Sequence, residues 1–111
     1  MESTRQNKIS RLIQKEMGEL LQQSAQLFPG AMITVTRVNV TPDLSLARVN
    51  VSIFATDNKE SVLKSLDKHS RELRFLLGKR IHNQVRIIPE LQFFIDDTLD
   101  YLEKIDNLLK Q

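Results

Sequence analysis

Alternating apolar and polar residues mark the middle of the chain as a β-hairpin. From residue 46 to residue 54, apolar side chains fall at every second position, at Ala47, Val49, Val51 and Ile53. A period of two buries one face of a strand. Another β-branched run precedes it at residues 33–40, and the Pro42-Asp43 pair between the runs has the residue types of a tight turn. We therefore predict a long hairpin whose apolar face needs a cover of helices.

The first strand of this hairpin is less regular than the second. Ile33 and Val35 have one parity, whereas Val38 and Val40 have the other. A β-bulge near Thr36-Arg37 would shift the phase in this way, and a strand buried on both faces would give a similar pattern.

Helical spacing dominates the segments on either side of the hairpin. Apolar residues recur every three or four positions between residues 5 and 27, which predicts an amphipathic helix ended by Pro29-Gly30. Its N-cap is Ser3, Thr4 or Asn7. The same spacing returns between residues 62 and 81, with a polar gap at residues 68–70. This second segment is either one long helix or two helices joined by a kink.

The C-terminal third of the chain predicts one more strand and one more helix. Leu91, Phe93 and Ile95 alternate after Pro89, which favours a strand start or an edge strand. Helical spacing follows from residue 98. The whole order is helix, strand, strand, one or two helices, strand, helix, which is typical of a two-layer α+β domain. We expect a single domain over residues 1–111, with residues 98–111 as a C-terminal helical extension.

The residue types exclude several classes of function. The chain has no Cys, so disulfides and thiolate chemistry are excluded. It also contains no run of about 18 apolar residues, the length that a membrane-spanning helix needs. No secretory signal and no phosphate-binding or hydrolase motif occurs. His69 and His82 lie thirteen residues apart without a carboxylate cluster, so we interpret them as surface or partner-contact residues. We expect a cytoplasmic protein that is not an enzyme and holds no metal or cofactor.

Charge is distributed unevenly along the chain. Residues 1–89 hold 14 Lys or Arg against 8 Asp or Glu, whereas residues 90–111 hold 2 against 6. A basic body is typical of proteins that bind polyanions, although ordinary solubilising charge gives the same totals. Helical spacing aligns the basic residues into two stripes, and the second is continuous if the second helical segment is unbroken. The candidate RNA contacts are Arg5, Lys8, Arg11, Lys15, Lys64, Lys68, Arg71, Arg74, Lys79, Arg80 and Arg86.

Several short motifs occur in series along nearly the whole chain: RQNKI (5–9), VTPDL (40–44), ARVNV (47–51), LRFLLGKR (73–80), VRIIPELQF (85–93) and DDTL (96–99). In this order and spacing, the chain resembles the ribosome-binding factor A family. The resemblance implies a K-homology-like fold of the second topological type, with the element order α-β-β-α-α-β. It also implies a bacterial assembly factor that binds the free small ribosomal subunit and assists late maturation and 5′-end processing of 16S rRNA, supporting growth in the cold.

The chain departs from the family pattern at one position. The family usually carries an Ala-x-Gly kink between the paired helices, and the corresponding residues here are His69, Ser70 and Arg71. No Gly-x-x-G occurs either, so the usual backbone clamp on single-stranded nucleotides is absent. A kink at this stretch would therefore be shallower than that of the family, or made without a glycine at positive φ.

These observations favour a protein that binds folded RNA through phosphates and shape. Four phenylalanines, Phe28, Phe75, Phe93 and Phe94, lie in or beside apolar runs, so base stacking is not expected; Phe54 is the exception. We expect a monomer whose partners are the small subunit with its 16S rRNA, together with other assembly factors or GTPases. The alternative is a protein-interaction module that uses its sheet edge or acidic C-terminal helix.

Overall fold

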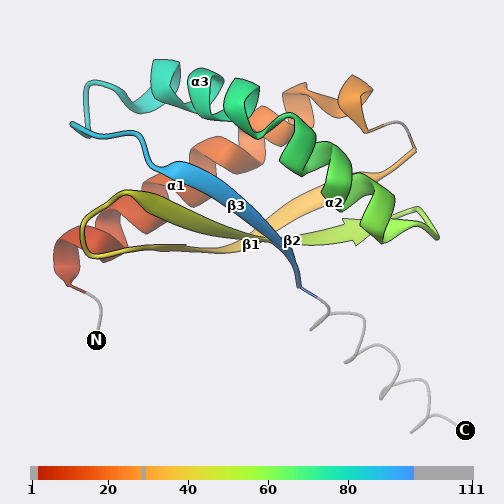
Figure 1. Ribbon diagram of the computed structural model, residues 1–111, viewed down its shortest axis with the longest axis horizontal. Coiled ribbons are helices and arrows are strands. Elements are labelled where there is room, and N and C mark those ends of the chain that lie inside the picture. Colours follow the sequence, from red (N-terminus) through yellow and green to blue (C-terminus); the bar gives the residue numbers. More distant parts are fainter. Residues whose placement is uncertain (1–2, 29, 97–111) are drawn as a thin grey trace, which may run out of the picture.

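Three helices cover one face of a three-stranded sheet (Figure 1). The computed structural model describes residues 3–28 and 30–96. The elements are α1 (Thr4–Gln23), a short 3₁₀ helix (Ala25–Leu27), β1 (Met32–Val40), β2 (Leu46–Phe54), α2 (Lys59–Lys68), α3 (Ser70–Ile81) and β3 (Glu90–Ile95). The predicted two-layer α+β class and the α-β-β-α-α-β order are confirmed. The helix predicted at residues 98–111 lies outside the described residues.

The predicted hairpin is formed by β1 and β2, which pair antiparallel with Val35 opposite Val51 and Val38 opposite Val49. The register shifts between Val35 and Arg37, which confirms a bulge at this point. On β2 the alternating residues Ala47, Val49, Val51 and Ile53 are all buried. The period-two pattern therefore identified the core face correctly.

A hydrogen-bonded loop closes the hairpin at the predicted turn. The Asp43 carboxylate accepts hydrogen bonds from Thr41 Oγ1 (2.7 Å), Ser45 Oγ (2.8 Å) and Ser45 N (3.1 Å). These bonds favour the ionised carboxylate and lower the pKa of Asp43. Leu44 adopts a left-handed conformation with φ of 62°. The turn is therefore held by side-chain hydrogen bonds as well as by the proline.

The third strand, β3, lies parallel to β2, which places β2 at the centre of the sheet. It begins directly after Pro89 and occupies an edge, as predicted. Phe93 is buried, while Gln92 and Phe94 on either side are exposed. The apolar face of β3 therefore joins the core formed by β2 and the helices.

Helix α1 begins with a capping box and packs over the edge strand β1. Ser3 is the N-cap: its hydroxyl accepts from Gln6 N (3.1 Å), and the Gln6 side chain accepts from Ser3 N (3.0 Å). The buried Gln6 amide also donates to Val40 O (3.0 Å), and Ser10 Oγ accepts from Val40 N (3.3 Å). Both backbone groups of Val40 are thus satisfied by α1. The helix ends at Gln23, whereas the predicted helix extends to residue 27.

The second helical segment consists of two helices that meet at His69. This residue has φ −98° and ψ 12°, which is compatible with an ordinary side chain. Its ring Nδ1 lies 2.8 Å from Ser65 O, and the ring meets Phe28 edge-on at 6.4 Å between centroids. The junction therefore lies within the stretch 69–71 and needs no glycine. It also shows that His69 is a half-buried packing residue rather than a free surface histidine.

Candidate nucleic-acid interface

The positive charge of the described residues lies mainly on the helical layer. Four Lys or Arg residues are on α1, three on α2 and four on α3, and Arg86 follows α3; only Arg37 and Arg48 are on strands. The same helices carry five Asp or Glu, so they remain strongly basic overall. The helical side is therefore the better candidate for a polyanion contact.

The α1 stripe consists of Arg5, Lys8, Arg11 and Lys15, all of them exposed. At 3.6 residues per turn, these positions lie opposite the buried residues Ile9, Ile13 and Met17. None of the four forms an ion pair with another residue in the described part of the chain. The structure thus presents this predicted stripe to solvent.

The second predicted stripe is not continuous. Lys64 and Lys68 are exposed on α2, whereas Arg71 and Arg74 are exposed on α3 beyond the junction at His69. Of the two alternatives left open for this segment, two helices joined by a kink is therefore the correct one. A kinked pair of helices instead presents two short basic segments.

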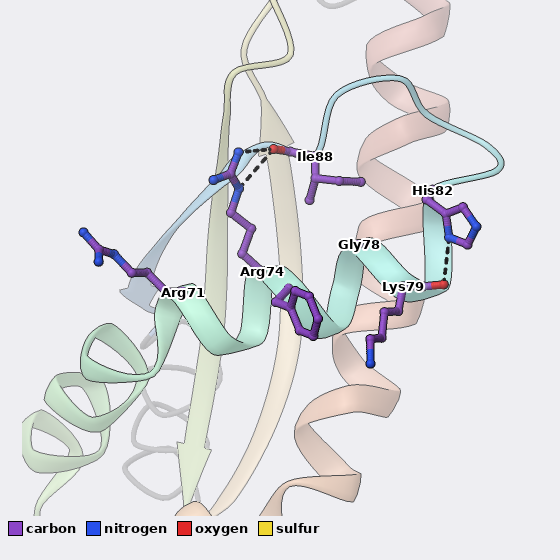
Figure 2. A pocket seen from close by; sticks show the side chains of 7 residues that line it. Arg71, Arg74, Gly78, Lys79, His82 and Ile88 are labelled. Carbon is purple, nitrogen blue, oxygen red and sulfur yellow. Dashed lines mark hydrogen bonds between the residues drawn. The ribbon is translucent and has the colours of Figure 1, made fainter.

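The α3 segment forms one side of a groove of about 490 Å³ (Figure 2). The groove residues are Arg71, Arg74, Phe75, Gly78, Lys79, His82 and Ile88. Arg74 donates from Nε (3.1 Å) and from the terminal Nη2 (2.7 Å) to Ile88 O, so its guanidinium holds the loop that forms the other side. Arg74 is therefore both a cation of the groove and a structural contact.

The apolar neighbours of Phe75 in the sequence suggested a core position, but this residue lies outside the core. It is 63% exposed, and Lys79 Nζ lies 4.8 Å from the centre of its ring. The sequence contains the reason, because Leu73, Leu77 and Ile81 are spaced by four and form the buried side of α3. Phe75 lies on the opposite side of that helix. Phe75, Gly78, His82 and Ile88 line the groove but are not among the contacts predicted from the sequence.

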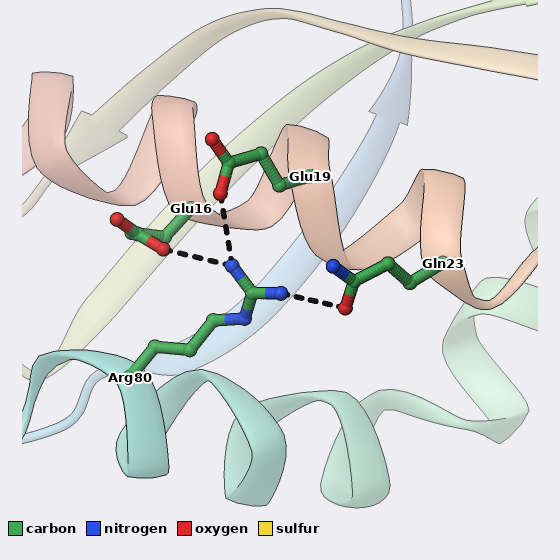
Figure 3. Close-up of polar contacts among 4 residues, drawn as sticks. All are labelled: Glu16, Glu19, Gln23 and Arg80. Atoms are coloured by element: carbon green, nitrogen blue, oxygen red, sulfur yellow. Dashed lines mark hydrogen bonds and ion pairs between the residues drawn. The ribbon is translucent and has the colours of Figure 1, made fainter.

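Arg80 differs from the other predicted contacts because its guanidinium is occupied within the protein (Figure 3). Its Nη1 lies 2.9 Å from Glu16 Oε2 and 3.0 Å from Glu19 Oε2, and Nη2 donates to Gln23 at 2.6 Å. All three partners are on α1. Arg80 therefore joins α3 to α1, and we do not include it in the candidate interface.

Arg86 lies at the end of the molecule where α1 begins. It lines a hollow with Arg5, Ile87 and the hairpin loop residues 42–44. Lys8 and Arg5 line an adjoining hollow with Gln84 and Val85. Cations from two distant parts of the sequence thus meet here, although Asp43 reduces the local positive charge.

The described residues contain no group of three His, Asp or Glu that could hold a metal ion. None of their helices is long and apolar enough to cross a bilayer.

Comparison with known proteins identifies the family. The model of the family described as ribosome-binding factor A matches residues 5–109. This chain belongs to the ribosome-binding factor A family. A ribosome-binding factor A from Cytophaga hutchinsonii is 46% identical over the whole chain and 84% of its own length. One from Flavobacterium johnsoniae is 40% identical over 98% of this chain and 85% of its own length.

Solved structures of ribosome-binding factor A have the same fold. The crystal structure of the Thermus thermophilus protein matches with a TM-score of 0.68 and 25% identity, covering 81% of this chain and 94% of that one. A homology model of the T. thermophilus protein, fitted into a cryo-EM map of its complex with the 30S subunit, matches with a TM-score of 0.61 and 26% identity. That match covers 77% of this chain and 88% of the other. The predicted resemblance and the K-homology-like fold are confirmed, and the family is one of ribosome-binding factors rather than enzymes.

Proposed function

We propose that this ribosome-binding factor A binds the small ribosomal subunit by gripping 16S rRNA with the basic surfaces of its helical layer. The observation that carries this proposal is the T. thermophilus relative fitted into a 30S complex, which has the same fold over 77% of this chain. Exposed cations of α1, α2 and α3 that have no ion pair within the described residues supply the charge complementarity that phosphate contacts need: Arg5, Lys8, Arg11, Lys15, Lys64, Lys68 and Arg71.

The mode of binding that we propose follows from the cationic side chains on the rigid helices. Lys and Arg side chains on rigid helices contact phosphates at fixed spacing, and such contacts position RNA without reading its sequence. The junction at His69 takes the place of a glycine loop and does not supply the backbone clamp of a Gly-x-x-G motif. Recognition therefore depends on the shape of a folded RNA surface.

The finer role that we propose is assistance in late maturation and 5′-end processing of 16S rRNA, without catalysis by this protein. Binding that favours one RNA conformation shifts the population toward it, because a ligand stabilises the state that it binds more tightly. A protein with this action would matter most in the cold, when RNA rearrangements are slow.

Co-sedimentation with purified small subunits and with whole ribosomes tests the binding proposal. We expect binding to the free subunit and little to the whole ribosome. The double variant Lys68→Ala with Arg71→Ala should bind more weakly. It should also reduce the magnitude of the slope of log affinity against log salt by about 2, because each phosphate contact contributes about 1.

The matched control is the pair Arg37→Ala with Arg48→Ala, which also removes two exposed cations but from the strands. An equal loss in this control would place the contact on the sheet. Absence of subunit binding by the unaltered protein would overturn the proposal. Capture of a protein partner that survives nuclease treatment would instead support the protein-interaction alternative.

A further inference from the structure

The groove along α3 combines an exposed aromatic ring with cations on the same side of a helix. We propose that it is a stacking site for one unpaired nucleobase of RNA, in which Phe75 is the platform and Arg71 and Lys79 contact the neighbouring phosphates. This inference rests on the proposed function, because that function supplies RNA as the ligand.

The spacing of the three residues suits this task. Arg71, Phe75 and Lys79 follow one another at intervals of four, so they form a single ridge with about 5–6 Å between neighbouring Cβ atoms. Phe75 is therefore bracketed by a cation one turn before it and another one turn after it. A nucleotide that stacks on the ring has positive charge within reach on both sides.

The ring is available to a ligand. Phe75 is 63% exposed, and the Lys79 ammonium, 4.8 Å from its centre, lies over only one face. A base can stack on the remaining face, since every base has a π-face and stacking does not depend on base identity. The site therefore adds affinity without adding sequence readout, in agreement with recognition by shape.

The groove is formed before any ligand arrives. The two hydrogen bonds from Arg74 to Ile88 O hold the loop against α3. Gly78 lies beside this loop, since a Cβ at its position would be in van der Waals contact with Ile88 Cγ1 at 3.4 Å. The volume of about 490 Å³ falls within the usual range for small-ligand pockets, about 300–1,000 Å³.

The charge of the groove favours a nucleotide over other occupants. Arg71, Arg74 and Lys79 line it, and no carboxylate is among its lining residues. A purely apolar ligand would leave the charges of Arg71 and Lys79 unmatched, and a simple anion would make no use of the Phe75 ring. A nucleotide matches both features, because it joins a flat base to a phosphate.

The test compares Phe75→Leu with Phe75→Tyr in small-subunit co-sedimentation. Leucine retains an apolar side chain but removes the π-face, whereas tyrosine retains the ring. We expect Phe75→Leu to weaken binding about 5- to 150-fold, the usual effect of losing one stacked base, and Phe75→Tyr to bind like the unaltered protein. Because Phe75 is exposed, both variants should melt at the unaltered temperature.

Phe94→Leu is the matched control, because Phe94 is a partly exposed phenylalanine (38%) on β3 rather than on α3. Ultraviolet cross-linking of the small-subunit complex followed by mass spectrometry should recover a nucleotide attached to Phe75. Unchanged binding by Phe75→Leu, with weaker binding by Lys68→Ala and Arg71→Ala, would overturn the stacking site and leave the proposed function intact. A loss in Phe94→Leu alone would also overturn it, and failure of the unaltered protein to bind would overturn both proposals.

Discussion

Individual residues with the same charge have different tasks in this protein. Arg71 is exposed and free of ion pairs within the described residues, whereas Arg80 is bound to Glu16, Glu19 and Gln23 on α1. Only 23% of the Arg80 side chain is exposed. Basic residues of one helix therefore separate into those that can contact RNA and those that hold the protein together.

Arg80→Ala should lower stability more than it lowers RNA binding. Loss of the contacts to α1 should cost about 1 kcal/mol, which corresponds to roughly 4–8 °C in melting temperature for a domain of this size. Thermal melting and subunit co-sedimentation measure the two effects. For Arg71→Ala we expect the opposite result, weaker binding with little change in melting temperature. An unchanged melting temperature together with weaker binding would return Arg80 to the interface.

The hairpin turn should give a distinct pH signature at Asp43. Hydrogen bonds from Thr41 and Ser45 lower the pKa of this carboxyl, so its contribution to stability is present above the pKa of the unfolded chain. That contribution is lost as the pH falls through the lower folded value. NMR titration of the Asp43 carboxyl carbon should give a midpoint below the usual aspartate range, and Thr41→Val with Ser45→Ala should raise it. A midpoint at the usual value in the unaltered protein would contradict the assignment.

Secondary-structure elements followed local patterns where one face was uniformly buried. The alternation on β2 and β3 and the helical spacing of α1 predicted these elements correctly. Helix ends were less predictable, because the 3₁₀ helix Ala25–Leu27 continues the apolar spacing after α1 has ended at Gln23. The sequence also did not decide between one long helix and two helices joined by a kink. His69 packs at the junction through contacts with Ser65 and Phe28, which cannot be predicted from the residue type alone.

Two glycines should respond oppositely to alanine. Gly18 lies within α1, and a Cβ there would meet nothing within 4 Å. Gly18→Ala should therefore stabilise the protein by about 0.5–1 kcal/mol through helix propensity. Gly30 has φ of 79°, so Gly30→Ala should destabilise it by about 1–2 kcal/mol. Chemical denaturation of both variants measures the difference, and effects of the same sign would contradict the structural roles given to them.

At the scale of the whole molecule, the helices gather the positive charge on one side. If about six cations each meet a phosphate, the slope of log affinity against log salt should be on the order of −4 to −5. Subunit binding across a salt series measures this slope. A flat response would show that the association does not depend on phosphate contacts.

Period and spacing along the chain were enough to establish the order of strands and helical segments, the phase shift near Thr36, the core face of β2 and the basic faces of the helices, because each depends on neighbours within a few residues. Tertiary structure decided which charged and aromatic side chains remain available. Arg80 is occupied by carboxylates 61 and 64 residues away, and the groove beside Phe75 exists because Arg74 holds the backbone of Ile88, 14 residues further on. Such contacts bring distant segments together through packing, so they follow from the arrangement of the helices and not from any local repeat.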